Sequence, residues 1–170
     1  MLLGHYLLFR GDSRRRVEPS ELTTQLWPSS EGPSACHVLV VQSSKSKTNQ
    51  TGAKYYMGAL RHKDPMLCTM GALAQYLVWR WHMSGEPGPS FRSRADWYRL
   101  KLLVGDEPPA ELAYTTQYDC CLACFQEAGV TTDGVTHCMR GCGARLAEAL
   151  GVAEGQVSQS PFHSSHSTAN

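Results

Sequence analysis

Two short apolar segments separated by a polar stretch constrain the fold of this chain more than any other feature. Residues 37–42 are rich in β-branched side chains, and residues 53–60, which include Tyr55 and Tyr56, have a similar strand-forming composition. The polar residues 43–52 between them carry two lysines. The pattern predicts a two- or three-stranded antiparallel sheet near residues 37–60, with Lys45 and Lys47 at the tip of a hairpin.

Helical patterns lie on both sides of the predicted sheet. Residues 70–82 have apolar side chains at helical spacing, which predicts an amphipathic helix. Residues 114–128 predict a second helix that is stopped by a glycine, and residues 144–149 a third. Residues 2–9 predict an apolar helix that is broken at Gly11. The core positions expected in the helix at 70–82 are Leu73, Leu77, Val78 and Trp81.

Length and composition indicate a single domain. A chain of 170 residues with 42% hydrophobic content can bury one modest core. No apolar run approaches the roughly 20 residues of a membrane-spanning helix, and no signal peptide is recognisable, so we expect a soluble, unsecreted protein with reduced cysteines. We predict an α+β fold, mainly α, over residues 1–155, followed by a disordered Ser- and His-rich tail at residues 156–170.

Positive charge is concentrated near the start of the chain. The formal net charge is only +1, but acids are few among the first 63 residues. A locally basic surface of this kind is typical of nucleic-acid binding, and its plain alternative is a solvated face. The basic residues in this stretch are Arg10, Arg14, Arg15, Arg16, Lys45, Lys47, Lys54, Arg61, His62 and Lys63.

A His-x-x-Arg step, His137 to Arg140, precedes the last predicted helix. With Arg14 and Lys47 upstream, it completes an order of cationic donors that could hold one phosphodiester. Each residue also has a plain structural interpretation. His137 could cap a helix, Arg140 could pair with a nearby acid, and Lys47 could be an ordinary solvated lysine.

Cysteines near this step offer a rival chemistry. Cys121, Cys124, Cys138 and Cys142, with His137 adjacent, would supply enough ligands for a tetrahedral zinc site. Both cysteine pairs fall inside helical patterns, however, whereas zinc knuckles usually take ligand pairs from tight turns. Cysteine is also a common small buried side chain. We therefore predict no metal and no cofactor, and keep a zinc-stabilised interaction module as an alternative.

Several ordered blocks resemble a known family. Taken together over residues 1–163, they resemble the DNA-binding core, domain 2, of the fungal centromere-binding factor subunit and its relatives, the Crypton-type tyrosine recombinases. The resemblance implies a tyrosine-recombinase-like helical catalytic-domain fold with a small sheet bearing a lysine hairpin. For the centromere subunit it implies DNA binding without strand exchange. The blocks are LLFRGDSR at 7–14, KTNQTG at 47–52, RHKD at 61–64 with Cys68, GALAQYL at 71–77 and THCMRGCGAR at 136–145.

The resemblance also implies roles for particular residues. Arg14 resembles the first catalytic arginine, with Arg10 and Arg15 competing for the register, and Lys47 resembles the hairpin lysine. His137 and Arg140 resemble the His-x-x-Arg pair, and His163 falls near the later His or Trp position.

The family's nucleophile has no match, because this sequence has no tyrosine after Tyr118. We therefore expect a fragment, a truncated gene model or a domesticated remnant, without the N-terminal clamp domain and the tyrosine segment. Its catalytic positions are predicted to be vestigial, and the chain is predicted not to be an enzyme.

The expected function is binding of double-stranded DNA in the nucleus, with no membrane partner and with a second copy of the chain as a candidate partner. An active recombinase or transposase fragment that takes its tyrosine from another chain is the alternative. The expected contacts are mainly with phosphates. The residues expected to contact DNA are Arg10, Arg14, Arg15, Lys45, Lys47, Lys54, Arg61, His62, Lys63, His137, Arg140 and Arg145.

Overall fold

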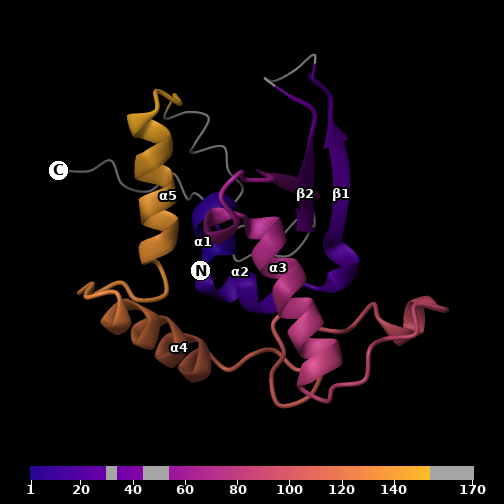
Figure 1. Ribbon diagram of the computed structural model, residues 1–170. Coiled ribbons are helices and arrows are strands. Elements are labelled where there is room, and N and C mark those ends of the chain that lie inside the picture. Colours follow the sequence, from indigo (N-terminus) through magenta and orange to yellow (C-terminus); the bar gives the residue numbers. More distant parts are fainter. Residues whose placement is uncertain (30–33, 44–53, 154–170) are drawn as a thin grey trace.

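The fold is α+β and mainly α, as predicted, with helices around a small antiparallel sheet (Figure 1). The computed structural model describes residues 1–29, 34–43 and 54–153. In these ranges the regular elements are α1 (Leu2–Tyr6), α2 (Gly11–Arg16), η1 (Pro19–Glu21), β1 (Leu22–Trp27), β2 (Cys36–Ser43), β3 (Tyr55–Leu60), η3 (Pro65–Leu67), α3 (Thr69–Val78), η4 (Trp79–Met83), η5 (Arg94–Asp96), α4 (Tyr114–Glu127) and α5 (Cys138–Ala149).

The sheet has β2 at its centre, paired antiparallel with β1 on one side and β3 on the other. Leu39 lies opposite Ala59, and Val41 lies opposite Met57. Because side chains alternate between the faces of a strand, Leu39 and Val41 share one face. Both are buried in the main hydrophobic core, where Leu73 and Leu77 of α3 pack against the cluster, as the helical spacing predicted.

The apolar start of the chain departs from the predicted helix at residues 2–9. Helix α1 ends at Tyr6, and Leu8 adopts a positive φ of 52°. This turn places Leu7 and Phe9 in the core, at 2% and 1% exposure. Burial of these two side chains outweighs continuation of the helix. Gly11, where the helix was predicted to break, is the first residue of α2.

Strand β1 was not predicted. Its sequence, LTTQLW, gives no clean alternation, and five of its six residues are exposed. As an edge strand with little apolar surface to bury, it is held by its hydrogen-bonded pairing with β2 rather than by a pattern visible in the sequence. The strands predicted at 37–42 and 53–60 correspond to β2 and β3.

The helix predicted at 70–82 is present but changes its geometry near its end. It runs as α3 to Val78 and continues as one π-helical turn, η4. The wider turn shifts the helical phase, so that Arg80 rather than Trp81 is fully buried. Val78, expected in the core, is 54% exposed, and that expectation was wrong. Trp81 packs on Phe91 rather than in the main core.

The later helices agree with the sequence pattern. Helix α4 matches the prediction at 114–128, whereas α5 begins at Cys138, before the segment predicted at 144–149. Most of the hairpin tip, with Lys45 and Lys47, and the tail at 156–170, with His163, lie outside the described residues. Over the described residues, no helix is both long and apolar enough to cross a bilayer.

A very close approach joins the two ends of the described chain. Helix α5 packs on α1, where Gly143 faces the main-chain carbonyl of His5 so closely that a Cβ at this position would overlap the carbonyl oxygen. Only glycine allows backbones to approach to this degree. The contact sets the position of α5, and with it the position of the His-x-x-Arg step.

A buried arginine fixes the segment that follows η4. Arg80 is completely buried and forms an ion pair with Glu86, whose side chain is 13% exposed. Its Nη1 also donates to the carbonyl oxygens of Lys101 and Leu102. Arg80 therefore ties both ends of the loop at 84–102 to the helical framework.

Replacing Arg80 with methionine should lower the free energy of unfolding by about 3–5 kcal/mol, because the largely buried Glu86 carboxylate and the carbonyl oxygens of Lys101 and Leu102 lose their donor. Urea denaturation measures the change. The matched control is Arg92→Met, at an exposed arginine, which should stay within about 0.5 kcal/mol of wild type. A loss below about 1 kcal/mol for Arg80→Met would show that the ion pair does not hold the loop.

Two glycines of α5 provide a second test of the packing. Gly143→Ala should destabilise the protein by about 1–3 kcal/mol, because the methyl group must push α5 away from α1. Gly141→Ala, two residues earlier, should stabilise it by about 0.5–1 kcal/mol, because its Cβ would lie 3.9 Å from the nearest atom, Arg145 Nη2. Thermal and urea denaturation of the two variants should shift in opposite directions.

Candidate nucleic-acid interface

Several of the sequence-predicted cations meet where α1, α2 and α5 come together, and we call Arg10, Arg14, His137 and Arg140 the arginine junction. Arg10 is the N-cap residue of α2, and Arg14 lies within that helix. His137 is the N-cap residue of α5, and Arg140 lies in its first turn. The α1–α5 packing thus brings together residues more than 120 positions apart in the sequence.

Arg14 is the structural centre of the junction. It is only 4% exposed, and its Nη2 donates to the carbonyl oxygen of Thr136 at 2.8 Å. Gly4 of α1 leaves room for its guanidinium, since a Cβ there would lie 3.1 Å from Nη1. Burial lowers the pKa of Arg14 below its ordinary value. Arg14 therefore ties α2 to the residue that precedes His137.

Arg140 is the second cross-link between the N-terminal segment and α5. Its Nη1 donates to the carbonyl oxygen of Leu8 at 3.0 Å, the residue with the positive φ. Partial burial, together with the positive charge of Arg10, lowers the pKa of Arg140 to about 10. Arg140 stays protonated at neutral pH, in a position where a nearby cation already repels it. An anion at this position would relieve that repulsion.

Arg15 and His137 have different surroundings from the two cross-linking arginines. Arg15 forms an ion pair with Asp12 at 3.2 Å and donates to Gln117 Oε1 at 3.0 Å, so it joins α2 to α4. His137 is exposed, with its Nδ1 3.1 Å from Thr136 Oγ1. Arg10, Arg14 and Arg15 were the candidates for the position of the first catalytic arginine. The side chain of Arg14 bonds to Thr136, which precedes His137.

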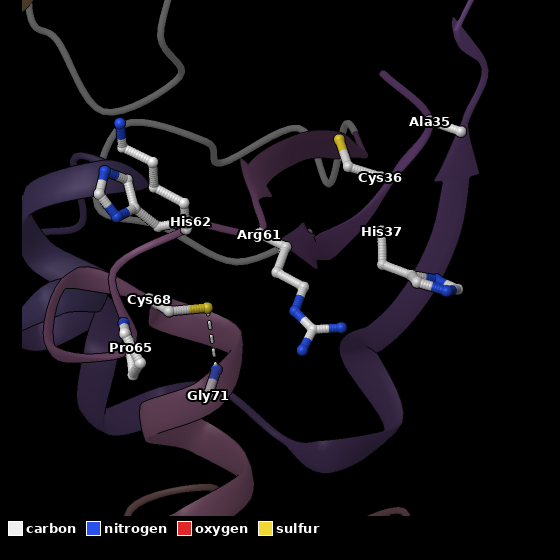
Figure 2. Close-up of a pocket in the computed structure, with 9 residues that line it drawn as sticks. Ala35, Cys36, His37, Arg61, His62, Pro65, Cys68 and Gly71 are labelled. Atoms are coloured by element: carbon white, nitrogen blue, oxygen red, sulfur yellow. Dashed lines mark hydrogen bonds between the residues drawn. The ribbon is translucent and has the colours of Figure 1, made fainter. Parts of the chain in front are cut away.

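A cavity of about 470 Å³ holds a second group of predicted residues, Arg61, His62 and Lys63, which we call the basic pocket. These three follow β3 directly and lead toward α3. The Arg61 main chain continues the sheet by donating to the carbonyl oxygen of His37 at 2.9 Å. Figure 2 shows the Arg61 side chain extending into the space between His37 of β2 and Gly71 of α3.

The first turn of α3 forms one wall of the basic pocket. Cys68 is the N-cap residue, and its Sγ accepts a hydrogen bond from the Gly71 amide at 3.3 Å (Figure 2). Burial by itself raises the pKa of this thiol, but hydrogen bonds from backbone groups and the charge of Arg61 outweigh it, so that the pKa is lowered. The pocket thus favours negative charge.

The remaining predicted cations are either outlying or outside the described residues. Lys54 is exposed just before β3, and Arg145 is exposed on α5. Lys45, Lys47 and His163 lie outside the described residues. The structure therefore gathers seven of the twelve predicted contact residues, four in the arginine junction and three in the basic pocket.

Sequence reasoning did not single out three exposed arginines between α3 and α4. Their signal is nonetheless visible, because SFRSRADWYR at 90–99 combines three arginines with three aromatic residues and only one acid. The residues are Arg92, Arg94 and Arg99.

The cysteines near α4 and α5 differ in their surroundings, and Cys124 is exposed. Cys121 is buried in a second hydrophobic cluster with Phe125 and Val135, and Cys138 packs against it. Cys138 and Cys142 have their sulfur atoms 3.9 Å apart. Within the part of the chain that the structure describes, no three His, Cys, Asp or Glu side chains gather as a metal site.

Comparison with known proteins gives one match. Neither the curated proteins nor the solved structures include one that matches this chain. The family described as "Centromere DNA-binding protein complex CBF3 subunit, domain 2" matches residues 1–169, which is nearly the whole sequence. The centromere part of the expected resemblance is thereby confirmed. The chain belongs to the family of domain 2 of the centromere DNA-binding CBF3 subunit.

Proposed function

We propose that this domain binds duplex DNA through the phosphate backbone and does not cleave it. Membership of a family named for a centromere DNA-binding complex supports DNA as the partner. The observation that carries the proposal is the basic pocket, where Arg61, His62 and Lys63 line one cavity at the start of α3. A subunit of such a complex works in the nucleus, and we place this protein there.

The basic pocket has the chemistry of a phosphate-binding site. Arg61 and Lys63 are exposed, so their charges are available to a phosphate at the surface. The first turn of the ten-residue helix α3 adds the positive end of its dipole. Such contacts hold the sugar-phosphate backbone without distinguishing bases, so affinity should depend steeply on salt.

The arginine junction supports binding rather than catalysis. A recombinase needs two guanidinium groups that reach the scissile phosphate. Here Arg14 is buried and donates to Thr136, while Arg140 donates to Leu8. Arg14 therefore serves as a structural cross-link, and Arg140 keeps only part of its surface for an anion. An active recombinase that takes a tyrosine from another chain is the alternative, and it would require Arg14 to leave its buried position.

Wild-type protein should bind a duplex of about 20 base pairs with an affinity that falls steeply between 50 and 200 mM salt. In the double variant Arg61→Ala/Lys63→Ala, the slope of log K against log salt should shrink by about 2, because two phosphate contacts are lost. Fluorescence anisotropy over a salt series measures both quantities.

The matched control for this titration is Arg16→Ala. Arg16 is an exposed arginine already paired with Asp12 and Glu111, so its loss should leave the salt slope unchanged. Absence of any DNA binding by the wild type at about 50 mM salt would rule out the proposed function. An unchanged slope in the double variant would instead remove the basic pocket from the interface.

A separate prediction concerns cleavage. A suicide substrate, which traps the covalent intermediate of tyrosine recombinases, should yield no protein–DNA adduct, because the arginines that would activate the phosphate are held by main-chain carbonyls. Denaturing gel electrophoresis with labelled DNA gives the readout. A covalent adduct that disappears on substitution of one tyrosine would establish catalysis.

A further inference from the structure

The segment at residues 90–99, which we call the arginine arm, projects from the body of the molecule. Figure 1 shows it extending to the right of the lower half of α3, on the side away from α4 and α5. Arg80 holds the base of the arm. It bonds to Glu86, which precedes the arm, and to the carbonyl oxygens of Lys101 and Leu102, which follow it. The arm is therefore anchored at both ends by one buried side chain.

Aromatic rings in the arm contact one another and Trp81. Phe91 lies edge-to-face against Trp81 at 6.0 Å and against Trp97 at 5.4 Å between ring centroids, and Trp97 contacts Tyr98 at 5.0 Å. Phe91 holds a positive φ of 54°, a conformation that costs energy for a bulky residue. The ring contacts of Phe91 compensate for that cost, so specific side-chain packing holds the arm in this conformation.

The arm's single acid is used inside it. Asp96 accepts hydrogen bonds from the Ser90 hydroxyl and from the Ser93 amide, and these bonds lower its pKa. Ser93 and Asp96 also form the capping box of η5. The carboxylate thereby stabilises the turn rather than pairing with an arginine.

The arm's three arginines are exposed at the surface. Among the described residues, none of Arg92, Arg94 and Arg99 forms an ion pair. By contrast, Arg15, Arg16, Arg80 and Lys101 each pair with an acid. The arm thus carries three cations against one anion, whereas the whole chain has a net charge of +1. Positive charge is therefore concentrated on the ten residues of the arm.

We propose that the arginine arm is a second DNA-binding surface, which contacts backbone phosphates of the same duplex as the basic pocket. The inference rests on the proposed function and extends it to residues outside the expected interface. Arg94 lies over the Tyr98 ring, 5.6 Å from its centroid, so its guanidinium is held in place before an anion arrives. Phe91 and Tyr98 are 53% and 42% exposed, so the arm presents aromatic rings as well as charge. The phosphate backbone is the favoured partner because the arm's three arginines outnumber its one acid, and that acid accepts hydrogen bonds within the arm.

The test is the triple variant Arg92→Gln/Arg94→Gln/Arg99→Gln, titrated with the same duplex over a salt series. Affinity at about 100 mM salt should fall at least about tenfold, and the salt slope should shrink by about 2 to 3, in line with the loss of up to three phosphate contacts. Thermal stability should be unchanged, because all three side chains are exposed. Arg16→Gln, at a paired surface arginine, is the control and should match wild type.

Hydroxyl-radical footprinting locates the contact. Since the arm projects away from α4 and α5, the triple variant should lose protection at one end of the footprint and keep it elsewhere. If the triple variant were unstable, single glutamine variants at the same positions should each reduce the slope by up to about 1.

The outcomes separate this inference from the proposed function. Wild-type binding with an unchanged slope and footprint in the triple variant would overturn the arm's role while leaving DNA binding intact. If the triple variant lost binding to an acidic protein partner but bound DNA as wild type does, the arm's role in DNA binding would also be overturned. Failure of the wild type to bind DNA at all would instead remove the proposed function.

Discussion

The rest of the structure depends on the closure of the N-terminal segment onto α5. Two arginines make this closure, Arg14 to the carbonyl oxygen of Thr136 and Arg140 to that of Leu8, and Gly143 lets the backbones meet. Both of these bonds are donated to neutral main-chain carbonyls. A charge-assisted bond of this kind is strong, but it keeps a guanidinium group in a partly dry environment, which costs solvation energy. The lowered pKa of both guanidinium groups reports that cost.

That cost connects the fold to the proposed function. A protein that only needed to pack its N-terminal segment on α5 could do so with apolar side chains, as buried ion pairs can often be replaced without loss. Retaining cations where Arg10 also repels Arg140 makes sense if an anion approaches part of the time. Each bond to a main-chain carbonyl, however, restricts how far the guanidinium can follow a phosphate. The junction is therefore better suited to strengthening a complex than to driving a reaction.

Sequence patterns captured the parts of the fold that depend on local periodicity. The strands β2 and β3, the helix α4 and the core positions Leu73 and Leu77 follow from alternation and helical spacing. Edge strand β1 could not be predicted, because its pairing with β2 is its main stabilisation. The π-helical turn at η4 buries Arg80 where the helical spacing predicted burial of Trp81. A hydrophobic pattern does not reveal such a one-residue change of helical phase. The His-x-x-Arg step marked Arg140, but its bond to Leu8, 132 positions away, is set by tertiary packing.

The distribution of charge determines how such a nearly neutral chain could orient on DNA. Residues 1–103 contain fourteen lysines and arginines against seven acids, whereas residues 104–170 contain two arginines against eight acids. Helix α4 lies in the acidic part, and the sheet, the basic pocket and the arginine arm all lie in the basic part. A phosphate backbone close to the basic pocket or the arm would be attracted by their cations, up to about a Debye length of roughly 10 Å. Arg140 and Arg145 are the two arginines of the later range, and Arg140 is held in the arginine junction by its bond to the carbonyl oxygen of Leu8. If the domain binds DNA as proposed, we expect first contact through the basic pocket and the arm, whose arginines and Lys63 are exposed, before contact with the more buried arginine junction.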